Sequence, residues 1–131
     1  MKRRASYDLS EFPQHHTDVL QEWFALVDRI EAKHGRLGPN DDSLSGRGNP
    51  YGPRRWDETG REGWRISTIR FYGKPHNNHG IGVDFYMMGL HIRAWGEYHI
   101  DVYIPSSKCD AANVREWLKF FAAKQGLIDR D

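Results

Sequence analysis

Residues 81–104 have the sequence IGVDFYMMGLHIRAWGEYHIDVYI. Apolar and polar side chains alternate through it, and glycine-bearing breaks at Met88-Gly89 and Trp95-Gly96-Glu97 divide it into three runs. Such alternation is typical of strands that bury one face and expose the other. The stretch therefore predicts three antiparallel strands, at residues 81–87, 90–94 and 98–104.

The flanking segments add a fourth strand, at residues 64–72, and two helices. Residues 17–34 and 107–125 place apolar side chains at helical spacing: Val19, Leu20, Trp23, Phe24, Val27 and Ile30 in the first, and Val114, Trp117, Leu118 and Phe121 in the second. Both segments end before a glycine, Gly35 or Gly126. The order helix, strands, helix predicts an α+β fold: an antiparallel meander of about four strands, with both helices packed on one face.

The helix starts carry capping residues. Thr17 or Asp18 can cap the first helix, and Ser107 or Asp110 the second, because their side-chain oxygens can accept hydrogen bonds from exposed backbone N–H groups.

Residues 35–63 form a predicted long loop, because they contain seven glycines and three prolines. Within it, Tyr51, Arg54, Arg55 and Trp56 combine aromatic and basic side chains that could hold a partner. Similar groups also occur where a loop packs on its own domain, so both interpretations stay open.

The composition predicts one cytoplasmic domain over residues 1–131, in a chain with one cysteine. No apolar run has the length of a signal peptide or a membrane span, so we expect no membrane partner. Nineteen Lys and Arg residues nearly balance eighteen Asp and Glu residues, giving a formal net charge of +1. General attraction to nucleic acid is therefore not expected, and no motif predicts a cofactor.

The turn lengths predict a pairing of the strands. A two-residue turn at Met88-Gly89 places Tyr86 opposite His91, and a three-residue turn at residues 95–97 places His91 opposite Asp101. Two polar rows follow on the face away from the helices, with Trp95 and Tyr103 nearby. The rows are Tyr86, His91, Asp101 and Asp84, Arg93, His99.

This surface is compatible with three functions. His91 as general base, Asp101 as its orienting carboxylate and Arg93 as an anion clamp would make a metal-independent hydrolase or nuclease. The aromatic side chains could instead stack nucleic-acid bases, although carboxylates on the same surface repel phosphates. A solvated charge ladder that only holds strand register is the structural alternative.

Metal binding and cysteine chemistry have weaker support. His76 and His79 form a local pair that lacks a third ligand with recognised spacing. Cys109 lies near the start of the second helix, where a lowered pKa could make it a nucleophile, but the sequence places no histidine beside it. We expect neither to be a functional centre.

The sequence favours a protein-binding module over an enzyme. Trp, Tyr and Arg dominate binding hot spots, and they are the types found on the predicted face and loop. We therefore expect an inhibitor or immunity-type protein that blocks an enzyme or a nucleic-acid-handling complex, with self-association into a homodimer as an alternative use of the surface. The expected partner-binding residues are Asp84, Tyr86, His91, Arg93, Trp95, His99, Tyr103, Tyr51, Arg54, Arg55 and Trp56.

Overall fold

The structure of the chain is a computed structural model that describes residues 11–37, 50–58, 61–68, 70–71 and 78–130. Its helices are η1 (Gln14–His16), α1 (Thr17–His34), η2 (Ser106–Lys108) and α2 (Ala111–Lys124). Its strands are β1 (Arg54–Glu58), β2 (Arg61–Ser67), β3 (Arg70–Phe71), β4 (Asn78–Tyr86), β5 (Gly89–Trp95) and β6 (Ile100–Pro105).

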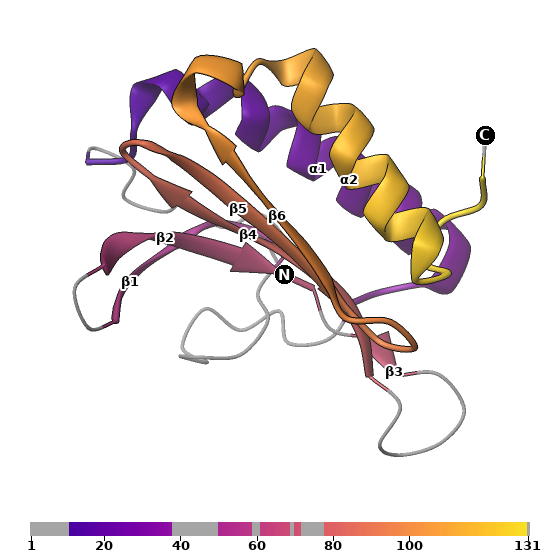
Figure 1. The fold of residues 1–131 in the computed structure, drawn as a ribbon. Helices are drawn as coiled ribbons and strands as arrows, with labels where there is room; N and C mark the ends of the chain where they lie inside the picture. The colour runs from indigo at the N-terminus through magenta and orange to yellow at the C-terminus, as the bar shows by residue number, and fades with distance from the viewer. Residues whose placement is uncertain (1–10, 38–49, 59–60, 69, 72–77, 131) are drawn as a thin grey trace.

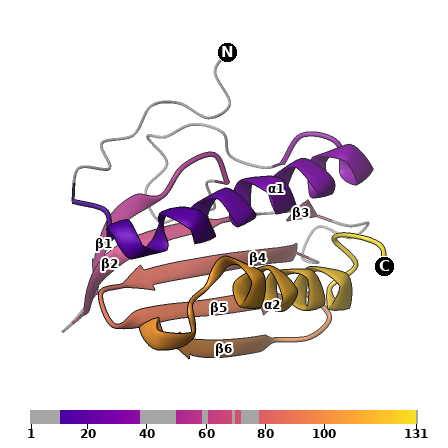
Figure 2. The ribbon, with the colours of Figure 1, turned by 90° about the horizontal axis from the view of Figure 1, so that it is seen from above.

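The predicted α+β fold is confirmed. Strands β1, β2, β4, β5 and β6 form an antiparallel meander in that order, and the short β3 pairs with β4. Both long helices lie on one face of this sheet, α1 nearer β2 and β4 and α2 nearer β5 and β6 (Figures 1 and 2). The meander has one strand more than the four expected.

The additional strand, β1, lies within the segment predicted to be a loop. Its sequence, RRWDE, pairs with β2 from Arg54 opposite Arg65 to Glu58 opposite Arg61. Four of its five residues are charged, so the strand has no apolar alternation from which it could be predicted. Charged residues are common on edge strands, because they discourage pairing with other chains.

The core lies between the helices and the sheet. The inward-facing residues of β4 and β5 that alternation predicted, such as Ile81, Phe85 and Ile92, are fully buried beneath α1 and α2. Trp23 of α1 is also fully buried, and its indole Nε1 donates a hydrogen bond to the carbonyl of Pro50 at 3.0 Å. Burial of this kind contributes roughly 25 cal/mol per Å² of apolar surface, and it is the main force that joins the two layers.

The helix ends follow the prediction in three of four cases. Gly35 ends α1 with φ +83°, a conformation that favours glycine, and Gly126 follows α2 with φ +75°. Asp110 caps α2, since its Oδ1 accepts the backbone N–H of Asn113 at 2.8 Å. The N-cap prediction for α1 is wrong: the 3₁₀ turn η1 leads directly into Thr17, and the cap position is His16, which makes no side-chain cap.

The predicted strand pairing is wrong by two residues. Phe85, not Met87, lies opposite Leu90, and His91 lies opposite Asp84 on one side and Tyr103 on the other. The turn of the β4–β5 hairpin is Met87-Met88, which leaves Met87 67% exposed, and Gly89 belongs to β5. Because the shift is an even number, every side chain of these strands keeps its predicted face.

Gly89 explains the error. A glycine beside a hairpin normally indicates the turn itself. Here a Cβ at position 89 would lie 2.8 Å from the Tyr103 hydroxyl and 3.0 Å from Cα of Pro105, so the residue is required for close approach to β6.

Candidate functional site

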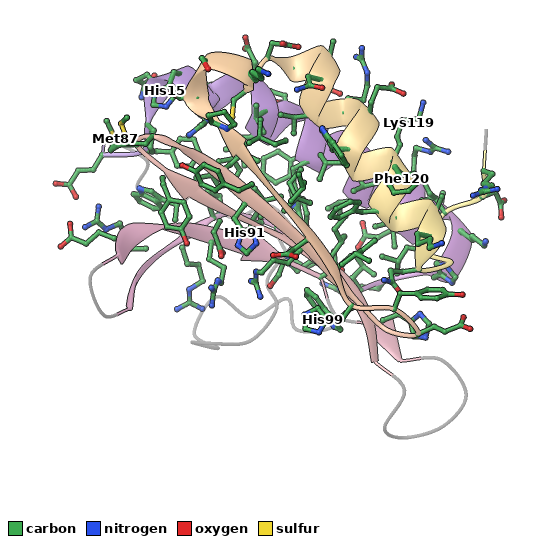
Figure 3. The ribbon with its side chains drawn as sticks, in the orientation of Figure 1. His15, Met87, His91, His99, Lys119 and Phe120 are labelled. Carbon is green, nitrogen blue, oxygen red and sulfur yellow. The ribbon has the colours of Figure 1, made fainter. Side chains whose placement is uncertain are left out.

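The sheet face opposite the helices, which no helix of the described residues covers, is called the open face below. It carries Arg65, Asp84, Tyr86, His91, Arg93, Trp95, Asp101 and Tyr103, as strand parity requires. His91 and His99 lie below the strands in Figure 3, whereas Lys119 and Phe120 lie on α2 above them.

Asp84 is the centre of the polar residues on the open face. Its side chain is only 2% exposed. Arg65, directly opposite on β2, donates from Nε to Oδ1 at 2.7 Å and from Nη2 to Oδ2 at 3.1 Å. Arg93 of β5 places Nε 3.4 Å from Oδ2, within ion-pair distance. A buried carboxylate is stable only with such partners. Asp84 fixes Arg65 by two hydrogen bonds, whereas the buried Nε of Arg93 makes the ion pair without a hydrogen bond among the described residues.

His91 joins this centre to the edge strand β6. Its Nε2 donates to Oδ2 of Asp101 at 2.7 Å, and its Nδ1 lies 4.0 Å from Oδ2 of Asp84. The predicted contact of His91 with Asp101 is therefore present, although it crosses the ladder diagonally: Arg93, not His91, is the residue opposite Asp101. Both ring nitrogens face a carboxylate.

The aromatic side chains of the open face lie over glycines. A Cβ on Gly63 would be 3.0 Å from Cδ1 of Tyr86, and a Cβ on Gly80 would overlap the indole ring of Trp95. At Gly89 a Cβ would meet only the hydroxyl of Tyr103, at 2.8 Å, and the Tyr103 side chain is 53% exposed. The rings of Tyr86 and Trp95 therefore occupy the space of a missing side chain on the neighbouring strand and pack against its backbone.

Two other predicted partner-binding residues, Tyr51 and Arg55, lie elsewhere, and a third, His99, lies just before β6. Tyr51 is 2% exposed, and its hydroxyl donates to Oε2 of Glu31 on α1 at 2.9 Å, so this part of the loop packs on its own domain. Arg55 stacks on Trp64, with 5.6 Å from Cζ to the ring centroid, and Trp64 belongs to the helix-facing side of β2. His99 is exposed in the turn before β6, and the predicted place of His99 opposite Arg93 is occupied by Asp101.

The remaining two members of the loop group are in β1. Arg54 lies opposite Arg65, and its Nη1 is buried with no hydrogen-bond partner among the described residues. Trp56 pairs with Gly63 through the backbone, but its side chain lies outside the described part of the structure.

The described residues do not form a metal site. No three His, Cys, Asp or Glu side chains among them are close enough to hold an ion. His79 donates from Nδ1 to the carbonyl of Gln125 at 2.8 Å, whereas His76 lies outside the described residues. The described helices also include none with the length and apolar character of a membrane span.

Cys109 is not activated as a nucleophile. It is 8% exposed, and its thiol donates to the carbonyls of Ile104 at 3.2 Å and Pro105 at 3.3 Å. Burial raises the pKa of Cys109 above its usual value, so the thiol form is favoured over the reactive thiolate.

The sequence did not predict the roles of two residues, Arg65 and His16. Arg65 alternates with the buried Trp64 and Ile66, a pattern that could have placed it on the open face. His16 gives no such signal: it is fully buried, donates from Nε2 to the carbonyl of Tyr86 at 2.8 Å, and leaves Nδ1 without a partner among the described residues. Burial lowers the pKa of His16; the bond to Tyr86 opposes this change, and the neighbouring His15 adds to it.

The site thus consists of a buried carboxylate paired with two arginines, a histidine between two carboxylates, and two aromatic rings over glycines. Comparison of the chain with protein-family models, with curated proteins and with solved structures gives no match.

Proposed function

We propose that the chain is a small protein-binding module, an inhibitor or immunity-type protein that blocks an enzyme or a nucleic-acid-handling complex through its open face. The observation that carries this proposal is that several side chains of this face are already held by their neighbours. Arg65 is held by two hydrogen bonds to the buried Asp84, Arg93 forms an ion pair with the same carboxylate, and the rings of Tyr86 and Trp95 lie against glycines.

Side chains that are fixed before a partner binds favour association. Association normally loses about 0.5–1.5 kcal/mol for each flexible side chain that becomes fixed at an interface. On the open face, much of this ordering is complete before a partner arrives. Trp, Tyr and Arg are also the residue types that most often act as hot spots, especially where neighbouring groups exclude water.

The same contacts give less support to a hydrolase. A general base needs a ring nitrogen that can accept a proton from the substrate or from water. In His91, Nε2 is hydrogen-bonded to Asp101 and Nδ1 faces Asp84, so each ring nitrogen is directed at a carboxylate and not at a substrate or water. Base stacking is less supported as well, because Asp84 offsets part of the positive charge of Arg65 and Arg93, and Asp101 adds a second carboxylate that repels phosphates.

The test starts with recovery of a stoichiometric partner by the tagged full chain from its own cells. The affinity of this partner is then measured for the wild type, Trp95→Ala and Arg93→Ala, with Arg115→Ala as the matched control. Arg115 lies on α2, also forms an ion pair, and is 50% exposed. Circular dichroism checks that each variant is folded.

We expect Trp95→Ala to weaken binding about 30-fold, the equivalent of about 2 kcal/mol for a hot-spot residue. Arg93→Ala should weaken it about tenfold, and Arg115→Ala less than about threefold. Equal affinity of all four proteins would reject the open face as the binding surface.

A further inference from the structure

The two edges of the sheet differ in character. β1, at one edge, has the sequence RRWDE, whereas β6, at the other, has the sequence IDVYIP with a single charge. Among the described residues β6 pairs only with β5, and Figure 2 shows it along the outer side of the sheet. An edge strand rich in β-branched and aromatic residues is a template for another strand.

The ladder shows which backbone groups of β6 face outward. The N–H of Ser106 donates to the carbonyl of Met88 at 2.8 Å, so this pair continues the hydrogen-bonded pairs between β5 and β6. In an antiparallel ladder such pairs alternate with pairs whose backbone groups point away. Asp101 and Tyr103 therefore direct their N–H and C=O groups out from the sheet edge.

Apolar side chains along the β6 edge are only partly covered. Ile100 and Val102 of β6 and Trp117 of α2 pack against the core but are only half-buried. Their neighbours one strand inward, Ile92 and Ala94, are completely buried. Another strand beside β6 would cover the apolar side chains that the end of the sheet leaves accessible.

We propose that this strand is β6 of a second copy of the chain, paired antiparallel about a twofold axis at Val102. This pairing places Val102 opposite Val102 and Ile100 opposite Ile104 of the other copy, so the apolar faces of the two strands lie side by side. The helices of both copies then lie on one side of a continuous sheet. The small net charge of +1 produces little repulsion between copies.

The choice of axis follows from the residues of β6. An axis at Asp101 would place two carboxylates opposite each other, which is destabilising. An axis at Tyr103 would place Pro105, which has no N–H, opposite Asp101. An axis at Val102 avoids both, because Asp101 and Tyr103 of one copy exchange backbone hydrogen bonds with Tyr103 and Asp101 of the other.

This inference does not depend on the proposed function, because it uses the edge of the sheet and not its open face. Since β6 has six residues, the contact is at the small end of specific interfaces, and we expect dissociation constants in the micromolar range. The dimer would also join the two open faces into one surface.

Sedimentation of the full chain over a wide range of concentration tests the dimer. Tyr103→Pro removes an outward N–H and leaves the β5–β6 ladder intact, whereas its matched control Tyr103→Thr keeps the N–H. We expect the dissociation constant of Tyr103→Pro to be at least tenfold higher than that of Tyr103→Thr, with both variants folded by circular dichroism. A chain that is monomeric at every concentration, or equal constants for the two variants, would overturn the proposal.

Cysteine cross-linking tests the register. Under mild oxidation Val102→Cys should form a disulfide-linked dimer, because a residue on the axis faces itself in a non-hydrogen-bonded pair with Cα atoms about 4.5 Å apart. Tyr103→Cys should cross-link much more slowly, and the wild type, whose Cys109 is buried, should not cross-link. Faster cross-linking of Tyr103→Cys than of Val102→Cys would contradict the Val102 axis.

Discussion

Replacing Arg65 with methionine removes the strongest partner of the buried Asp84. The carboxylate is 2% exposed and accepts two hydrogen bonds from Arg65, at 2.7 and 3.1 Å. Loss of one member of a buried ion pair typically destabilises a protein by about 3–5 kcal/mol, because the remaining charge stays out of water. Here Arg93 remains 3.4 Å away and compensates in part, so we expect a loss of about 2–3 kcal/mol.

Urea unfolding monitored by circular dichroism measures this loss as a lower transition midpoint with an unchanged slope. For a chain of this size the same loss lowers Tm by about 10 °C. Arg115→Met is the matched control, because Arg115 forms an exposed ion pair with Glu22 at 3.7 Å. Such pairs contribute little, and the control should lose less than about 0.5 kcal/mol.

A double-mutant cycle separates the ion pair from the packing of the arginine side chain. In Arg65→Met/Asp84→Met the carboxylate is also absent, so the second replacement should recover part of the stability that the first removes. We expect a coupling energy of at least about 1.5 kcal/mol. A coupling below about 0.5 kcal/mol, or equal losses for Arg65→Met and Arg115→Met, would refute the central role of Asp84.

Two further predictions concern buried titratable groups. In the folded chain the pKa of His16 lies below its usual value of 6.5, so the unfolded chain binds the proton more readily. The contribution of His16 to the free energy of unfolding should therefore be constant above about pH 6.5 and fall below this pH, by up to about 1.4 kcal/mol per pH unit. His16→Gln, which keeps a donor for Tyr86, should reduce this decline in urea titrations at about pH 7.5 and 5.5; an identical decline would contradict the assignment. Cys109 should react with a thiol reagent at least about tenfold more slowly in the folded chain than in urea, and equal rates would show that its thiol is accessible.

The recurrence of apolar residues predicted which sides of the helices and strands are buried. In a strand this depends only on whether a residue occupies an odd or an even position. The bounds of α1 and the buried faces of β4 and β5 follow from where apolar side chains recur, and a shift of two residues leaves these faces unchanged. Strand β1 could not be predicted in this way, because its stability comes from pairing with β2 and not from an apolar face of its own.

The candidate site was predicted only in part. The contact of His91 with Asp101 was predicted in spite of the two-residue error in register, because both side chains lie on the same face of neighbouring strands and the imidazole reaches its diagonal neighbour. The contact of Arg65 with Asp84 depends instead on the register of β2 with β4, which no short turn connects. The hydrogen bond of the buried His16 is made to the carbonyl of Tyr86, which lies 70 residues further along the chain. Contacts of this kind are set by tertiary packing.

The rings that lie over glycines have a consequence for how this surface can vary in evolution. The ring of Tyr86 at Gly63 and the ring of Trp95 at Gly80 each fill the space that a side chain of the glycine would need, and the hydroxyl of Tyr103 approaches Gly89. A larger residue at one of these glycines leaves no room for its ring, and loss of a ring uncovers backbone. A Cβ at any of the three would also meet a backbone oxygen, of Phe85, Thr68 or Ile104, so related sequences should keep the glycine even where the aromatic residue changes.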